Sequence, residues 1–263
     1  MVKVVFGLVF GICSWYNAIV IAITITERGD PMPPKGKQPS GLLTQQKMLR
    51  AAVTQFLQKG YERATTADIA RDAGMSPASF FRAYPSKEAM LLEFVKWIFV
   101  GQYDLAQKIS GSDDPMLVCA VEGALELHTA ELSEQLRELY VAAYSLQTTS
   151  LYIYRVMSER LYQVFSQFQP EAKAKDFYEM EIASASMIRG YMAVPSDMYF
   201  TVEDKIRRFL DCALKLYNVE QESREQIIAA TMALDLHAIA EDIVRSTVKK
   251  VEDGLPITGQ LIY

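Results

Sequence analysis

The sequence is poor in the residue patterns that mark disulfide frameworks and structural metal sites. It has three cysteines in 263 residues, and Cys13, Cys119 and Cys212 are widely separated with no C-x-x-C pair. This spacing excludes a zinc finger, and it leaves one thiol unpaired under any single disulfide, which favours a reducing compartment. We find no internal repeat and no low-complexity tract, so solenoid and fibrous architectures are also excluded.

Motifs of the common enzyme classes are missing as well. The sequence has no G-x-S-x-G, no phosphate-binding loop and no H-E-x-x-H motif. It has only two histidines, and each shares a helical spacing with one acid: His128 with Glu131, and His237 with Glu241. One histidine beside one carboxylate is far short of a metal site. We therefore expect no enzymatic activity, no catalytic residue, no bound metal and no cofactor.

The residues that are abundant favour helices. Alternation of apolar and polar residues, the pattern of half-buried strands, is scarce, whereas Ala, Leu, Met, Glu, Gln and Lys dominate. The sequence therefore predicts an all-α protein. Half of the residues are hydrophobic, which is enough for one or two domains with a sizeable core.

Charge is distributed unevenly along the chain. Residues 32–88 carry nine Lys or Arg against four Asp or Glu, whereas residues 89–263 carry 16 against 26. A small basic unit followed by a larger acidic one suggests an anion-binding head on a body that avoids the same anion. Chance clustering of charges on solvated helix faces is the alternative.

The basic unit opens with a segment that has little to bury. Residues 32–43 are rich in Pro, Gly and Lys, and we expect a basic disordered tail there. Apolar residues spaced at i, i+3, i+4 and i+7 then predict a helix over residues 44–58, and Gly60 can end it with a left-handed cap.

Residues 65–84 hold the densest local signal, two short helices separated by a tight turn. Thr66 is a suitable N-cap for the first of them. Ser76 can cap the second, with Pro77 at its first position, where a missing N–H costs nothing. Ser86 is expected to cap a further, longer helix. Two short helices joined in this way predict a helix-turn-helix.

The second short helix has two different faces. Phe80 and Tyr84 are expected to pack beneath it, four residues apart. Its other face is small, polar or basic, so it suits a major groove about 12 Å wide, where Arg82 can reach a guanine edge or a phosphate. The helix N-termini at Thr66, Ser76 and Ser86 present N–H groups that suit phosphate oxygens, and Lys87 adds a cation beside one of them. Ordinary caps with an ordinary surface arginine are the alternative for each feature alone.

Three stretches in order, MLRAAVTQFLQKGYERATT, IARDAGMS and SFFRAYPSKEAML, resemble the TetR family of bacterial transcriptional regulators. The resemblance implies a DNA-binding domain at residues 44–98, with its motif at about residues 65–84. Two positions depart from the family: Phe81 stands where Tyr is usual, and Ala83 stands where His or Tyr is frequent. The candidate DNA contacts are Thr66, Ser76, Pro77, Ala78, Ser79, Phe81, Arg82, Ala83, Tyr84 and Lys87.

The rest of the chain, residues 99–263, is predicted to form a larger helical bundle for ligand binding and dimerisation. The resemblance implies that helices at residues 170–193 and 202–217 pack against their copies as a four-helix dimer interface. A last helix at residues 222–251 is additional to the commonest family plan. Further helices are predicted at residues 86–109, 115–130, 133–147 and 150–167.

The body is rich in aromatic and methionine side chains, a composition that suits an apolar pocket for a small molecule. A packed core is the alternative for most of them. Arg189 is a charge in the otherwise apolar stretch MIRGYM, where it can meet a polar or anionic ligand or form a simple salt bridge. The candidate ligand contacts are Trp97, Tyr103, Tyr140, Tyr144, Met157, Met187, Arg189 and Tyr191.

These features predict a sequence-specific transcriptional regulator, a ligand-responsive repressor that binds a palindromic operator in double-stranded DNA as a homodimer. Its partner would be a small-molecule effector of unidentified chemistry, and its place of action the cytoplasm, at the nucleoid. The alternative is a membrane-anchored helical sensor or interaction protein with a DNA-binding or vestigial head.

That alternative comes from an apolar N-terminal segment, residues 1–31. Residues 4–26 carry no charge and are long enough to span a bilayer as a helix, with Lys3 as a positive flank. A cleaved signal peptide would export a DNA-binding head to a place without DNA. Two interpretations stay open: an anchor, or an upstream extension of a protein whose translation starts at Met32.

Overall fold

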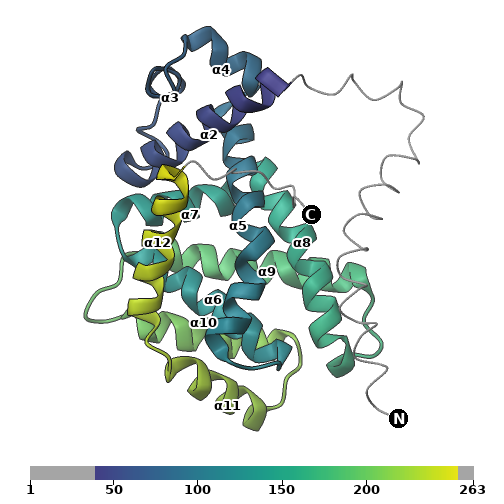
Figure 1. The fold of residues 1–263 in the computed structure, drawn as a ribbon. Coiled ribbons are helices and arrows are strands. Elements are labelled where there is room, and N and C mark those ends of the chain that lie inside the picture. Colours follow the sequence, from purple (N-terminus) through teal and green to yellow (C-terminus); the bar gives the residue numbers. More distant parts are fainter. Residues whose placement is uncertain (1–38, 254–263) are drawn as a thin grey trace, which may run out of the picture. The chain divides into compact units, whose positions relative to one another are not determined.

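The computed structural model describes residues 39–253, and this part of the chain is all-α, as predicted (Figure 1). Within it, no helix has the length and hydropathy that crossing a membrane would require. The apolar segment 4–26, and with it the anchor and the choice between Met1 and Met32, lies outside the described residues, as does most of the predicted tail.

Three helices form the amino-terminal head: α2 (Pro39–Lys59), α3 (Thr66–Asp72) and α4 (Pro77–Ala83). α2 begins at Pro39, within the segment predicted as a disordered tail and five residues before the predicted start at residue 44. A proline fits the first position of a helix because its missing N–H would have no partner there. Met48, Val53 and Phe56 of α2 are fully buried and form the core of the head.

The cap of α3 lies one residue earlier than predicted. Thr65 is the N-cap, and its Oγ1 accepts a hydrogen bond from the N–H of Asp68 at 3.1 Å. Thr66 is instead the first residue of the helix. Thr65 has the extended backbone that an N-cap requires, and its hydroxyl makes the capping bond that the prediction gave to its neighbour.

The turn between α3 and α4 depends on a glycine. Gly74 has a φ of +71°, in the left-handed region that favours glycine. The N–H of Met75 donates to the carbonyl of Ala70 at 2.8 Å, and the N–H of Gly74 donates to the carbonyl of Arg71 at 2.9 Å. These two bonds form a Schellman motif, which ends α3 and sets the direction of α4.

The body consists of the helices from α5 (Lys87–Ser110) onwards, and α6 (Pro115–Glu131) lies at its centre. α6 contacts α5 and every helix from α7 to α12, and its residues 118–130 are buried on nearly all sides. Around it lie α7 (Glu134–Ser145), α8 (Gln147–Phe165), the short 3₁₀ helix η1 (Ser166–Phe168), α9 (Ala174–Ala193) and α10 (Val202–Leu216) (Figure 1).

The last predicted helix, residues 222–251, is wrong as a single element. The structure has two helices there, α11 (Gln221–Met232) and α12 (Leu236–Glu252). Asp235 separates them because its side chain accepts the N–H of Ala238 at 3.1 Å and so starts a new helix. α12 contacts both α6 in the body and α2 in the head.

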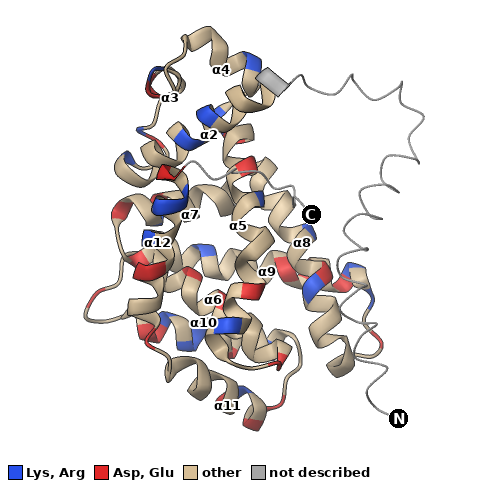
Figure 2. Cartoon of the chain, in the orientation of Figure 1, with Lys and Arg blue, Asp and Glu red and all other residues tan. Residues whose placement is uncertain are grey.

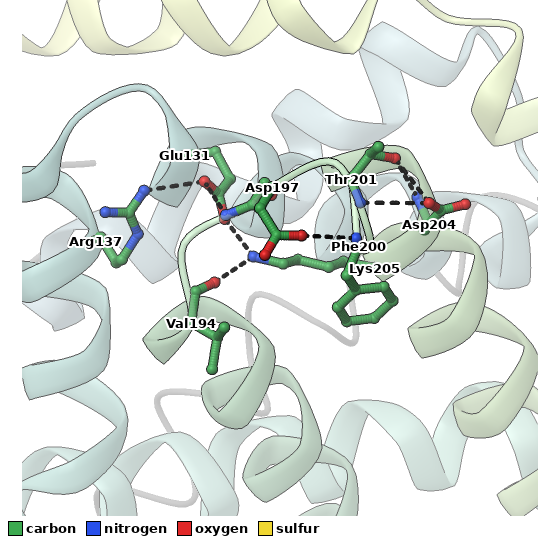
Figure 3. Close-up of polar contacts among 9 residues, drawn as sticks. Glu131, Arg137, Val194, Asp197, Phe200, Thr201, Asp204 and Lys205 are labelled. Atoms are coloured by element: carbon green, nitrogen blue, oxygen red, sulfur yellow. Dashed lines mark hydrogen bonds and ion pairs between the residues drawn. The ribbon is translucent and has the colours of Figure 1, made fainter.

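A buried lysine joins α10 to the end of α6 (Figure 3). Lys205 is fully buried, and its Nζ donates to Oε1 of Glu131 at 2.6 Å and to the carbonyl of Val194. Glu131 also accepts from Arg137 at 3.0 Å and from the N–H of Ser196 at 3.2 Å. Burial alone would raise the pKa of Glu131. The hydrogen bonds from these donors have the larger combined effect, so the pKa is lowered. The network fixes the loop between α9 and α10.

Candidate nucleic-acid interface and internal cavity

A row of polar side chains lies along the outer face of α4. The hydroxyls of Ser76 and Ser79 are 3.0 Å apart, and the guanidinium of Arg82 donates to Oγ of Ser79 at 2.9 Å. Ser76 therefore joins this row instead of capping the helix with its side chain. Basic residues mark α2 and α4 in Figure 2. The row presents hydroxyls and a cation at a short, solvent-facing helix, which suits the groove of a duplex.

Most of the other predicted DNA contacts surround this row. Pro77, Ala78 and Phe81 are exposed, and Thr66 and Ala83 are partly buried. The ring of Phe81 is 61% exposed although it is apolar. A large apolar side chain in open solvent is typical of a contact surface.

Tyr84, a predicted DNA contact, belongs to the core of the head and exposes little of its side chain. Its side chain is 6% exposed, and its hydroxyl donates to the carbonyl of Gln45 at 3.3 Å. The amide of Gln45 in turn donates to the carbonyl of Ala83 at 2.7 Å, at the end of α4. These contacts hold α4 against α2. Phe80 and Tyr84 are both buried beneath α4, as predicted.

Lys87 holds the loop between α2 and α3, and its predicted phosphate contact is not supported. Its Nζ donates to the carbonyls of Tyr61, Glu62 and Ala64 at 2.8, 3.4 and 3.2 Å, and it lies 4.2 Å from the centre of the Tyr61 ring. An ammonium group has three N–H donors. All three have partners within the protein, and burial lowers the pKa of Lys87.

The same loop is held from the body by α7. The carboxylate of Glu138 accepts the N–H of Glu62 and lies against Gly60, whose φ is +86°. At the start of α5, Oε1 of Glu88 accepts the N–H of Thr148 at 2.8 Å. The loop of the head is therefore connected to the body through Lys87 of α5 and Glu138 of α7, and Glu88 joins the start of α5 to α8.

A cavity of about 80 Å³ lies inside the body. Its wall is mostly apolar, and it is formed by residues of α6, α7, α8, α9 and α10. Three glutamates line it as well: Glu122 and Glu126 of α6 and Glu181 of α9, which are 3%, 7% and 4% exposed. A mostly apolar cavity with a few polar groups is the usual form of a small-molecule site.

Each glutamate has different partners. Nη1 of Arg160 donates to both carboxylate oxygens of Glu122 at 2.7 and 2.8 Å. Glu126 accepts from the hydroxyl of Tyr144 and from the amide of Gln102, both at 2.6 Å. Glu181 accepts from Oγ of Ser184 at 2.8 Å. Only Glu122 has a cationic partner among these contacts.

Burial raises the pKa of all three carboxyl groups. The pKa of Glu126 rises to about 7 and that of Glu181 to about 8, because both are desolvated and repelled by their carboxylate neighbours. The pKa of Glu122 is raised by burial even though Arg160 opposes this. The cavity therefore changes its charge near neutral pH.

A second, smaller cavity of about 40 Å³ shares Glu126 and Tyr144 with the first. It is lined mainly by apolar residues of α5 and α7, and by Gln102. The Oε1 atom of Gln102 is buried without a hydrogen-bond partner. The hydrogen-bonded pair of Glu126 and Tyr144 therefore belongs to the walls of both cavities.

The structure separates the predicted ligand contacts into two groups. Tyr144 and Met157 line the larger cavity, and Tyr140 and Tyr144 line the smaller one. The predicted ligand contacts that line neither cavity are Trp97, Tyr103, Met187, Arg189 and Tyr191.

Position on a helix explains why two of these residues lie outside the cavities. Ile188 lines the larger cavity, and adjacent helical residues point about 100° apart. Arg189 is therefore turned to the surface, where it is exposed, and Met187 is turned away on the other side. Elsewhere, Trp97 stacks on Phe94, and the Tyr103 ring lies 5.0 Å from the guanidinium of Arg160.

The three glutamates were not among the predicted ligand contacts. The available signal is in VCAVEGALEL, where Glu122 and Glu126 lie four residues apart in an otherwise apolar stretch. Such a spacing places both side chains on one face of a helix that is apolar all round. Glu181 has no comparable signal, because its sequence neighbours on α9 include exposed charges.

Comparisons with known proteins point to one family for the head. Residues 48–94 match the family model described as bacterial regulatory proteins, tetR family. Among solved structures, the chain is similar to RolR in complex with the ligand resorcinol, with a TM-score of 0.58 and 15% sequence identity, over 73% of this chain and 96% of that chain. At this identity the likeness concerns the fold. A search of curated protein sequences finds no match.

Proposed function

Since residues 48–94 place the chain in the TetR family of bacterial regulatory proteins, we propose that it is a ligand-responsive repressor that binds a palindromic operator as a homodimer. It acts without catalysis, in the cytoplasm, where the chromosome is accessible. We assign DNA binding to residues 44–98, and ligand binding and dimerisation to residues 99–263. The observation that carries the proposal is the row formed by Ser76, Ser79 and Arg82 on the second helix of a helix-turn-helix.

The proposal of a dimer comes from the shortness of α4, which carries the row of Ser76, Ser79 and Arg82. One short helix reads only a few base pairs, whereas two related by a twofold axis read a palindrome. The exposed face of α9 supplies a candidate interface, because it carries Ile182, Ala183, Ser186 and Gly190, which are apolar or small. The charged outer residues of α10 would lie at its edge.

Ligand response follows from the position of α7. This helix carries Tyr144 and Tyr140 at the two cavities and Glu138 at the loop of the head. RolR, whose fold is similar, binds resorcinol in the solved complex. A ligand that favours one position of α7 and α5 would favour one spacing of the two heads, which is a population shift between binding-competent and incompetent dimers.

Selection of bound sequences from random double-stranded DNA by the purified chain tests this function. We expect enrichment of a palindrome whose half-sites lie about one helical turn, 34–36 Å, apart, or a multiple of that. The Arg82→Ala variant serves as the control, because it keeps the fold and loses the exposed cation of α4. Enrichment of no sequence, or of the same sequences with the variant, would contradict the proposal.

A further inference from the structure

The larger cavity is lined by more carboxyl groups than it has cations to pair with them. Glu122, Glu126 and Glu181 line it, and Arg160 pairs with Glu122 alone. Within residues 39–253, no Lys, Arg or His belongs to the lining. Glu126 and Glu181 are therefore buried with neutral donors only, although a buried carboxylate requires a cation or several hydrogen bonds to remain ionised.

Glu181 also has an oxygen without a donor. Its Oε2 accepts from Ser184, whereas its Oε1 receives no hydrogen bond from the described part of the chain. The side chain is 4% exposed and belongs to the cavity wall. Across the shared wall, Oε1 of Gln102 is buried and also lacks a donor. Buried acceptors without donors are uncommon in proteins, so Oε1 of Gln102, beside Glu126 on the side of the smaller cavity, and the oxygen of Glu181 left open at the larger cavity both suit a ligand that donates hydrogen bonds.

Aromatic rings complete the wall. Phe165, Phe209 and Tyr217 line the cavity, and the rings of Phe165 and Tyr217 stack with centroids 4.8 Å apart. The face of an aromatic ring attracts a cation, most strongly where water is excluded. The volume of about 80 Å³ admits only a small molecule.

We propose that the cavity binds a small organic cation, with an ammonium group at Glu126 and Glu181 and a short aromatic or alkyl body against Phe165, Phe209 and Tyr217. The ligand carries its own positive charge and N–H donors to the two acids that lack a cationic partner. This inference rests on the proposed function only in treating the cavity as the effector site.

Calorimetric titration of the full chain near pH 8 tests the charge of the ligand, because primary amines are protonated there, as lysine is. Phenethylamine is the cationic probe, and 2-phenylethanol and 3-phenylpropionate are its neutral and anionic matches. We expect phenethylamine, or else butylamine or cyclohexylamine, to bind at least about tenfold more tightly than the matching alcohol and acid. Equal or tighter binding of a neutral or anionic compound, or binding of none of the three amines, would overturn the proposal.

Two isosteric variants test the site. Glu126→Gln and Glu181→Gln remove a charge and keep the shape, so each should weaken amine binding by about tenfold or more and leave alcohol binding unchanged. Glu179→Gln is the matched control, since Glu179 lies on α9 with Glu181 but is exposed. If the two variants bound the amine as the parent does, or lost amine and alcohol equally, the carboxylates would not be its partners.

Release of the selected operator separates this inference from the proposed function. If the amine binds in the cavity but does not change DNA affinity, the cavity binds a cation as proposed, and the proposed coupling of this cavity to DNA binding is contradicted. If resorcinol releases the operator and the amines do not bind, the proposal of a ligand-responsive repressor is supported and the proposal of a cationic ligand is overturned.

Discussion

At the scale of single residues, the outer face of α4 depends on Arg82. It is the one basic residue in the row with Ser76 and Ser79, and its side chain is exposed. Each Arg that neutralises a phosphate contributes about 0.9 to the slope of log affinity against log salt concentration. We expect Arg82→Ala to weaken operator binding at least about tenfold and to lower that slope by about 0.9 for each protomer.

Fluorescence anisotropy with labelled operator over a range of salt concentrations measures both effects. Arg155→Ala is the control, because Arg155 is exposed on α8, in the body. An unchanged slope with unchanged affinity would remove Arg82 from the interface.

Glu126 makes the stability of the body depend on pH. Because burial raises its pKa from the ordinary 4.5 to about 7, the folded chain keeps a proton that the unfolded chain has released. This stabilisation is complete below pH 4.5 and is lost as pH rises through about 7. Gln102, Tyr144, Glu122 and Arg160 are the polar groups that influence this carboxyl group. The shift corresponds to about 3 kcal/mol.

We therefore expect Glu126→Gln to be more stable than the parent near pH 8.5 and to lose that advantage near pH 5.5. Urea unfolding at the two pH values measures the difference, and Glu179→Gln should follow the parent. A variant that tracks the parent at both values would show that Glu126 does not carry this pH dependence.

At the scale of elements, local signals predicted the head better than the body. The glycine at 74, the proline at 77 and the serine at 86 define α3, α4 and α5 through short-range caps, so these helices could be placed from sequence. The division of residues 222–251 depends on Asp235, whose capping role competes with an apolar period that continues past it. Burial of Lys205 is decided by neighbours distant in sequence, which helical periodicity cannot identify, whereas Glu122 and Glu126 lie in a stretch that is apolar all round.

The connection between α6 and α10 supplies a prediction for these elements. Lys205→Met would leave the partly buried Glu131 with fewer donors, and breaking a buried ion pair typically costs about 3–5 kcal/mol. We expect a loss of unfolding free energy in this range near pH 7, measured by urea denaturation. The loss should shrink as pH falls, because the stability that comes from the lowered pKa of Glu131 is complete above the ordinary value of 4.5 and disappears as pH falls through the folded value.

Lys215→Met is the matched control on the same helix. Lys215 pairs with Asp211 at 2.6 Å, but its side chain is 54% exposed. Exposed pairs contribute at most about 1 kcal/mol. Similar losses in the two variants would mean that burial does not strengthen the Lys205 contact.

At the scale of the whole molecule, α9 connects the cavity to the proposed dimer face. Glu181, Ser184, Ala185 and Ile188 line the cavity, whereas Ile182 lies on the exposed side of the same helix. The loop that follows, fixed by the Lys205 network, exposes Met198 and Tyr199. Exposed apolar side chains beside a face of small residues favour contact with a second copy. In the proposed dimer, a ligand in the cavity would therefore lie one helix away from the partner protomer.

Ile182→Glu tests this arrangement by placing a charge on the proposed dimer face, where its desolvation would oppose association. Sedimentation equilibrium should show the dimer dissociation constant raised by about tenfold or more, and binding to the palindrome should weaken while binding to an isolated half-site stays the same. Leu105→Glu, on the exposed side of α5, is the control for added charge. A variant that remains dimeric like the parent would place the interface elsewhere, and the two heads would then be related through a different face of the body.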